Sequence, residues 1–227
     1  MSGYLQRDLE HVQQQVLALS GLVEEMIDDA TRALLGPSLE AARRVTNRDG
    51  EVDRQEVEIE NACLRMLVLH HPVARDLRRI LAILKVNNEL ERCADLAVNV
   101  AERSEEMVEH EDFRIPEKLR RMVKMAIDML RGAVDALVSQ DPEAARRIRL
   151  LDDDVDQLNR EIIEELRAVM RSDTHLVDAA LHCFSVTRHI ERIADHATNI
   201  AEDVVFLVEG AIVRHAPPLA GARERSP

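Results

Sequence analysis

The sequence predicts an all-α fold: two tandem three-helix bundle repeats, with six long helices and internal pseudo-two-fold symmetry. Seven glycines and seven prolines are spread over 227 residues, about half the usual share of these two residue types. Few turn-forming residues indicate few turns, and therefore long helices. Aromatic residues make up only 2% of the chain, which disfavours a β-sandwich or a barrel. A sequence repeat then divides the helices into two units.

The first half of the chain divides into three helical segments at its glycine and proline residues. Gly-Pro-Ser at residues 36–38 ends the first segment, and Ser38 can cap the second. Pro72 can occupy the first turn of the third helix, where proline is tolerated. We therefore expect helices at about residues 5–35, 38–70 and 72–109.

The second half of the chain is predicted to contain three more helices. A connector at residues 111–116 precedes the fourth helix, and Asp-Pro at residues 141–142 opens the fifth. Ser-Asp-Thr at residues 172–174 can cap the sixth. The expected helices span about residues 116–139, 142–171 and 174–210. Helices of about 30 residues are about 45 Å long, so the bundle is elongated.

The two halves of the chain repeat each other. Residues 91–102 and 191–202 are identical at eight of twelve positions, at an offset of 100. Residues 41–59 also match residues 144–162, at an offset of 103. Such self-similarity indicates two copies of one supersecondary unit. We therefore divide the chain into a first repeat, a second repeat and a disordered tail, at residues 1–110, 116–213 and 214–227.

Charge and composition exclude several classes of function. The net charge of −13 and the scarcity of aromatic rings argue against nucleic-acid binding. They favour cations, or proteins with basic surfaces, as partners. No apolar stretch is long enough for a signal peptide or a membrane span, so we expect a cytoplasmic protein. Three widely spaced cysteines are expected to be buried thiols, at Cys63, Cys93 and Cys183.

Acidic residues recur four positions apart on four of the predicted helices. Like charges at this spacing destabilise a helix by roughly 0.2–0.5 kcal/mol per pair. Four such pairs at repeat-related places therefore suggest a compensating cation. The pairs are Asp49/Asp53, Glu91/Asp95, Asp152/Asp156 and Glu191/Asp195.

The acidic pairs of neighbouring helices are expected to stand level with each other. Helices joined by a short turn pack antiparallel, so residues equally far from the turn lie at the same height. In the first repeat the pairs are centred on residues 51 and 93, and their midpoint, 72, falls in the turn. In the second repeat the midpoint of 154 and 193 also falls in the turn, at 173.5. Four carboxylates therefore converge in each repeat if the helix faces agree.

Ligation by oxygen alone selects divalent or trivalent ions such as iron, Mn²⁺ or Mg²⁺, with Ca²⁺ also possible. Zinc is less favoured because it usually takes His or Cys ligands. The alternative is a solvated acidic stripe, with Arg92 and Arg192 supplying ion pairs.

His196 is interpreted as a packing or surface residue, because the other repeat has Leu96 there. Solvated surface is the favoured interpretation of the arginines at positions 75, 78 and 79.

Two stretches resemble motifs of the PhoU family, whose members are built from two three-helix repeats. Residues 72–78 read Pro-Val-Ala-Arg-Asp-Leu-Arg, and residues 191–202 read Glu-Arg-Ile-Ala-Asp-His-Ala-Thr-Asn-Ile-Ala-Glu. The second repeat lacks the first stretch and has Asp-Thr-His-Leu at residues 173–176. The departures of the earlier copy from the longer motif include Cys93, Leu96 and Val98, and none of these is a carboxylate.

The resemblance implies a cytosolic regulator of high-affinity phosphate uptake that restrains the phosphate-starvation response. Its implied partners are the phosphate-specific ABC transporter and a sensor histidine kinase, so it would meet the membrane only peripherally. The resemblance also implies a homodimer and multinuclear metal clusters on the four acidic pairs, with Glu102 and Glu202 as weaker candidates.

No catalytic residue is predicted, because the acidic stripes offer carboxylates without a level His, Tyr or Lys to act as a general acid or base. A carboxylate-bridged metalloenzyme in a helical bundle is the alternative. A purely structural adaptor whose stripes bind no metal is a third possibility.

Overall fold

The computed structural model describes residues 3–36, 38–108, 110, 112–211 and 213. All regular structure in these residues is helical, which confirms the predicted all-α class. The helices are α1 (Gly3–Leu35), α2 (Leu39–His70), α3 (Ala74–Met107), α4 (Glu117–Ser139), α5 (Pro142–Ser172), the short 3-10 helix η1 (Thr174–Leu176) and α6 (Val177–Glu209). The tail predicted to be disordered, residues 214–227, lies outside the described residues.

Several helix ends lie where the capping signals predicted them. The Ser38 side chain accepts a hydrogen bond from the backbone N–H of Ala41 at the start of α2. The Asp141 carboxylate accepts from the N–H groups of Glu143 and Ala144, at 2.9 and 3.0 Å, and so caps α5. Each cap satisfies N–H groups that a helix N-terminus leaves without intrahelical partners.

The turn between α2 and α3 differs from the prediction. The third helix begins at Ala74 rather than at Pro72. His71 and Ala74 have φ angles of 45° and 48°, while Val73 between them is extended. Pro72 therefore belongs to the turn. The backbone is extended at Val73 and left-handed at Ala74, so a regular helix cannot run back to Pro72.

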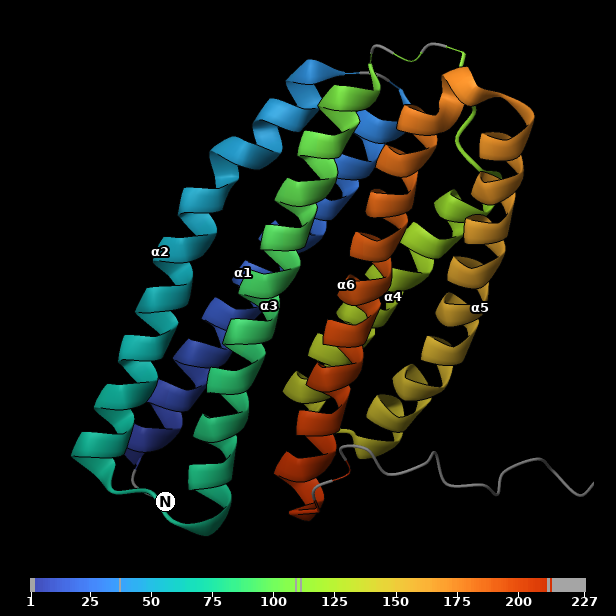
Figure 1. Ribbon diagram of the computed structural model, residues 1–227. Coiled ribbons are helices and arrows are strands. Elements are labelled where there is room, and N and C mark those ends of the chain that lie inside the picture. Colours follow the sequence, from blue (N-terminus) through green and yellow to red (C-terminus); the bar gives the residue numbers. More distant parts are fainter. Residues whose placement is uncertain (1–2, 37, 109, 111, 212, 214–227) are drawn as a thin grey trace, which may run out of the picture.

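The two repeats pack side by side as two three-helix bundles (Figure 1). Helices α3 and α6 lie next to each other between them and run in opposite directions. Two ion pairs show this antiparallel orientation: Lys85 contacts Asp203 at 2.8 Å, and Glu106 contacts His182 at 2.9 Å. The partner's residue number falls on α6 as the residue number rises on α3. One continuous apolar core extends through both bundles.

The pseudo-two-fold arrangement places the two inter-helix turns at opposite ends of the molecule. In Figure 1 the α2–α3 turn is at the bottom, and the α5–α6 turn is at the top. The three cysteines are buried and free, as predicted. None of the helices in the described ranges is long and apolar enough to cross a membrane.

Candidate metal centre

The structure brings together the four carboxylates predicted to stand level in the first repeat. Helix α2 supplies Asp49 and Asp53, and α3 supplies Glu91 and Asp95. Partial burial raises the pKa of Asp49, and the charges of Asp53 and Asp95 raise it further. The pKa of Asp95 is likewise raised by partial burial and then by Asp53. We call these four residues the first acidic cluster.

Glu56 adds a fifth carboxylate that the sequence analysis missed. Burial raises the pKa of Glu91, and the charges of Asp95 and Glu56 raise it further. Glu56 is fixed by the buried Asn87 of α3, whose Nδ2 donates to the Glu56 backbone O at 2.9 Å and to its Oε1 at 3.2 Å. Glu56 follows Asp53 by three positions on the same helix, a spacing that places it on the same face.

The second acidic cluster consists of Asp152 and Asp156 of α5 with Glu191 and Asp195 of α6. Partial removal from water and the charges of the other three carboxylates raise the pKa of Asp195 to about 6. Burial also raises the pKa of Asp152, although its Oδ1 accepts a hydrogen bond from Thr198 at 3.2 Å.

The two clusters differ in their neighbours. In the second repeat, Asn159 replaces the Glu56 of the first and donates to Glu191. Arg188 contacts Glu191 at 2.7 Å, and Arg160 contacts Asp156 at 3.5 Å. The first cluster therefore carries the larger number of carboxylates, whereas the second has ion pairs at its edge.

The two weaker candidates, Glu102 and Glu202, have different surroundings. Glu202 forms an ion pair with Arg149 of α5 at 3.2 Å. Glu102 is exposed on α3, about two helical turns beyond Asp95. Arg149 also acts on Asp152 of the second acidic cluster, and metal binding by Glu102 and Glu202 stays a prediction.

A polar depression of about 500 Å³ opens beside the first cluster, between α3 and α6. Glu91, Asp95 and Asn99 line it from α3, and Arg192 and His196 line it from α6. The first cluster thus opens toward the second repeat as well as to solvent.

His196 joins the two repeats. It is 7% exposed, and its Nδ1 lies 2.6 Å from Oε2 of Glu89 on α3. Asn199 donates to the same oxygen at 3.2 Å. These hydrogen bonds outweigh desolvation and lower the pKa of Glu89. His196 thus connects α6 to α3 through a buried polar contact.

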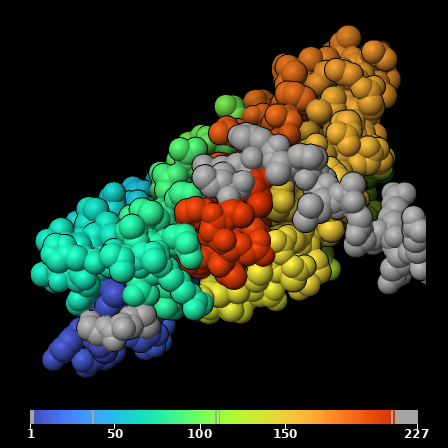
Figure 2. Space-filling model, turned by 90° about the horizontal axis from the view of Figure 1, so that it is seen from below, coloured from blue at the N-terminus to red at the C-terminus, as the bar shows by residue number. Residues whose placement is uncertain are grey.

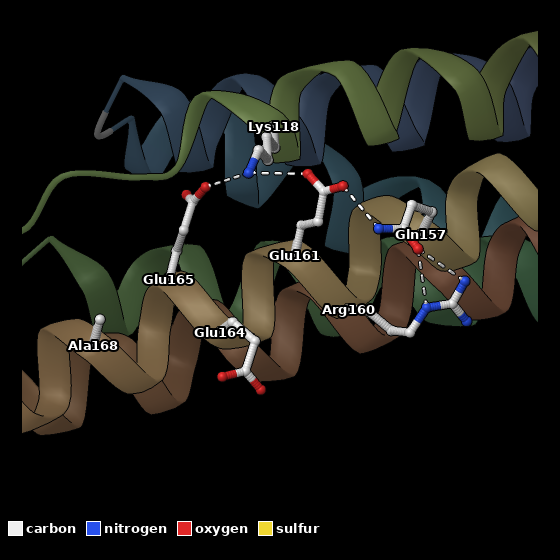
Figure 3. Close-up of a pocket in the computed structure, with 7 residues that line it drawn as sticks. All are labelled: Lys118, Gln157, Arg160, Glu161, Glu164, Glu165 and Ala168. Carbon is white, nitrogen blue, oxygen red and sulfur yellow. Dashed lines mark hydrogen bonds and ion pairs between the residues drawn. The ribbon is translucent and has the colours of Figure 1, made fainter.

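A second hollow, between α4 and α5, shows how this protein neutralises acidic residues without a metal (Figure 3). Lys118 reaches between Glu161 and Glu165, with Nζ–oxygen distances of 3.0 and 2.6 Å. Hydrogen bonds from Gln157 and Lys118 lower the pKa of Glu161. The acidic clusters behave in the opposite way, because burial, together with mutual repulsion, raises their carboxylate pKa values.

The chemistry of both clusters fits a hard cation. Their donors are carboxylate oxygens, the ligands that Mg²⁺, Mn²⁺ and iron accept. Among the described residues, no three His, Cys, Asp or Glu side chains already converge as ligands of a single ion. Ion binding therefore requires the carboxylates of a cluster to rotate toward a common point.

Replacing Asp195 with asparagine is expected to stabilise the metal-free protein by about 1 kcal/mol at neutral pH. A carboxylate whose pKa rises from 3.8 to about 6 on folding binds more protons in the folded state than in the unfolded state between about pH 3.8 and pH 6. Stability therefore falls as the pH rises through that window. The full shift would correspond to about 3 kcal/mol, which we reduce because Asp195 is partly exposed.

The measurement is chemical denaturation with chelator present, at pH 7 and near pH 4. Asp154→Asn is the matched control, because Asp154 is exposed on α5 outside the cluster. A loss of stability at pH 7 in Asp195→Asn would show that the cluster is not under electrostatic strain.

Comparison with known proteins gives a consistent result over both bundles. Residues 16–104 and 119–204 each match the PhoU domain. The phosphate-specific transport system accessory protein PhoU of Serratia marcescens is 34% identical over 95% of this chain and 88% of its own length. The PhoU homolog of Aquifex aeolicus, named in the same terms, is 38% identical over 92% of this chain and 95% of its own. The crystal structure of PhoU from Pseudomonas aeruginosa superimposes with a TM-score of 0.87, at 34% identity, covering 91% of this chain and 99% of that one.

Proposed function

The chain belongs to the PhoU family, and we propose that it is a cytoplasmic, non-enzymatic regulator of high-affinity phosphate uptake. The observation that carries the proposal is that both bundles match the PhoU domain. The relatives named as accessory proteins of phosphate-specific transport also align over most of their own length. A likeness of this extent includes both acidic clusters and the α3–α6 interface between the repeats.

In this proposal the protein restrains the phosphate-starvation response when phosphate is plentiful. It would do so as a homodimer, through contacts with the phosphate-specific ABC transporter and a sensor histidine kinase. The net charge of −13 supports partners that present basic surfaces or bound cations.

We further propose that each acidic cluster binds iron, Mn²⁺ or Mg²⁺, and that more than one ion can occupy a cluster. The raised pKa values of Asp49, Asp95 and Asp195 support this, because burial and then neighbouring carboxylate charges raise them, and a cation would offset both effects. A bound ion would join α2 to α3, or α5 to α6, and offer acidic groups of a partner a positive docking point. A metalloenzyme receives less support, since the relatives are named as accessory proteins.

The regulatory role can be tested in a bacterium that lacks its own PhoU protein and carries a phosphate-starvation reporter. Expression of this chain is expected to repress the reporter in phosphate-rich medium. The Asp95→Ala/Asp195→Ala double variant should repress it less, whereas Asp154→Ala should act like the wild type. Pull-down from the same cells, with and without chelator, would identify the partners and report whether metal matters. A folded, abundant wild-type chain that leaves the reporter fully active would contradict the proposal.

A further inference from the structure

The turn that joins α2 to α3 exposes four aliphatic side chains at one end of the molecule. Leu64, Val68, Leu69 and Val73 are 47%, 69%, 71% and 75% exposed. Seen from below in Figure 2, this region protrudes at one end of the protein, beside the start of α1. We call these four residues the apolar tip. They lie about 20–30 Å along the helices from the first acidic cluster.

The fold does not require aliphatic residues at these positions, as the second repeat shows. The residues equivalent to Leu64, Val68 and Leu69 are polar and exposed, namely Arg167, Arg171 and Ser172. The second turn itself is built around Asp173, which caps η1. Because the same architecture is stable with a polar turn, the exposed aliphatic side chains of the first repeat call for a separate explanation.

The apolar tip is also a basic part of an acidic protein. Residues 62–80 contain four arginines and one aspartate, whereas the whole chain has a net charge of −13. Arg75 hydrogen-bonds Gln140 at 2.7 Å, and Arg79 hydrogen-bonds Gln13 at 2.6 Å. A glutamine amide is neutral, so these two contacts do not cancel the guanidinium charge. The charge of Arg79 is partly offset by Asp76 and Glu10, whereas the arginines of residues 62–80 still outnumber the carboxylates in that segment. The tip therefore complements an anionic surface.

The shape of the tip favours a deformable partner. His71 and Ala74 adopt positive φ angles of 45° and 48°, and the extended Val73 lies between them at the end of the turn. Tyr4, which is 70% exposed, lies in the first turn of α1 at the same end, where Asp8 contacts His70 at 2.9 Å. Aliphatic side chains on a protruding turn, with arginines and an aromatic ring beside them, can enter the headgroup region of a bilayer.

We propose that the apolar tip binds directly to the surface of an anionic lipid bilayer. The aliphatic side chains would enter the boundary between headgroups and acyl chains, and the arginines would contact lipid phosphates. This goes beyond the proposed function, in which the protein reaches the membrane only through its partners. It does not depend on metal in the acidic clusters.

A single-tryptophan probe tests insertion directly, since the chain contains no tryptophan. Leu69→Trp is compared with Ser172→Trp, the equivalent position in the second repeat. With vesicles of phosphatidylcholine and phosphatidylglycerol, Leu69→Trp emission is expected to shift to the blue and to be quenched by brominated acyl chains. The Ser172→Trp variant should show neither change. Equal quenching of both probes, or of neither, would overturn the proposal.

Vesicle co-sedimentation of the otherwise unaltered chain provides an independent measurement. The Leu69→Ser/Val73→Ser variant should bind anionic vesicles about tenfold more weakly, because two aliphatic side chains no longer leave water. Leu150→Ser/Leu181→Ser is the matched control, since both leucines are exposed elsewhere, and it should bind like the wild type. Binding should weaken with added salt and with phosphatidylcholine alone.

Two results would assign the tip to a protein interface and so overturn the proposal. In one, Leu69→Ser/Val73→Ser keeps its vesicle affinity but changes the oligomeric state measured by sedimentation. In the other, it keeps its vesicle affinity but no longer captures the transporter or the kinase. The reporter assay uses the chain with its wild-type tip. A failure in that assay would therefore count against the regulatory proposal and not against membrane binding by the tip.

Discussion

Addition of Mn²⁺ to the chelator-treated protein is expected to raise its free energy of unfolding by about 2.7 kcal/mol for each acidic cluster that is filled, when free ion is at 100 times its dissociation constant. An ion that binds only the folded clusters stabilises the fold by mass action, and it also removes the repulsion among their carboxylates. For a chain of 227 residues, each filled cluster corresponds to a rise in Tm of about 5–10 °C.

Single substitutions measure how much each repeat contributes to metal binding and to the rise in Tm. Asp95→Ala and Asp195→Ala should each lose about half of the bound metal and part of the gain in Tm. Their effects should be nearly additive, because the clusters lie on separate helix pairs. Elemental analysis and thermal unfolding, with and without chelator, measure both quantities, and Asp154→Ala should match the wild type. An unchanged Tm with chelator, together with full metal content in both variants, would identify the clusters as solvated surface.

Replacing Glu89 with alanine is expected to destabilise the protein by about 3 kcal/mol. The substitution removes the acceptor of two hydrogen bonds, one from the buried His196 at 2.6 Å and one from Asn199 at 3.2 Å. Breaking a buried polar pair from one side leaves the other partner unsatisfied, which costs more than the pair itself contributes. Chemical denaturation at neutral pH measures the loss.

A double variant distinguishes the loss of the Glu89–His196 hydrogen bond from the loss of side-chain packing at the same site. In Glu89→Leu/His196→Leu both polar groups are absent, and the first repeat already has Leu96 at the position equivalent to His196. Most of the loss should therefore be recovered, leaving a cost of about 1 kcal/mol. A double variant as unstable as Glu89→Ala would show that shape, and not hydrogen bonding, dominates at this site.

The same pair predicts a dependence on pH. The pKa of Glu89 is lowered on folding from its ordinary value of 4.5. Its contribution is therefore complete above about pH 4.5 and is lost as the pH falls through the lower, folded value. The stability difference between wild type and Glu89→Ala should accordingly shrink in acid. A difference that stays constant would mean that ionised Glu89 is not what His196 contacts.

The level positions of the acidic pairs were predictable because they depend only on chain length and on antiparallel packing. Counting residues from the first turn placed Asp49 level with Asp95 and Asp53 level with Glu91. In the structure the charge of Asp95 acts on Asp49 and that of Asp53 acts on Glu91, so the structure agrees. Glu56 was missed because its contribution depends on the buried Asn87 of the neighbouring helix. Nothing local in the sequence marks that contact.

The contact between Glu89 and His196 also could not be predicted from the sequence, since it connects residues 107 positions apart in different repeats. The start of α3 was misplaced for a different reason. Proline is compatible with both a first helical turn and a tight turn, and the left-handed conformation of Ala74 decides between them. Metal binding by the clusters stays a prediction.

The Glu89–His196 contact also makes the two halves of the molecule non-interchangeable. If two copies of the first half docked through α3 as the halves do here, Glu89 would face Leu96, the counterpart of His196. A carboxylate would then be buried against a hydrocarbon side chain, which is costly. The contact thus favours pairing of unlike halves and disfavours self-pairing of the first half through the same interface.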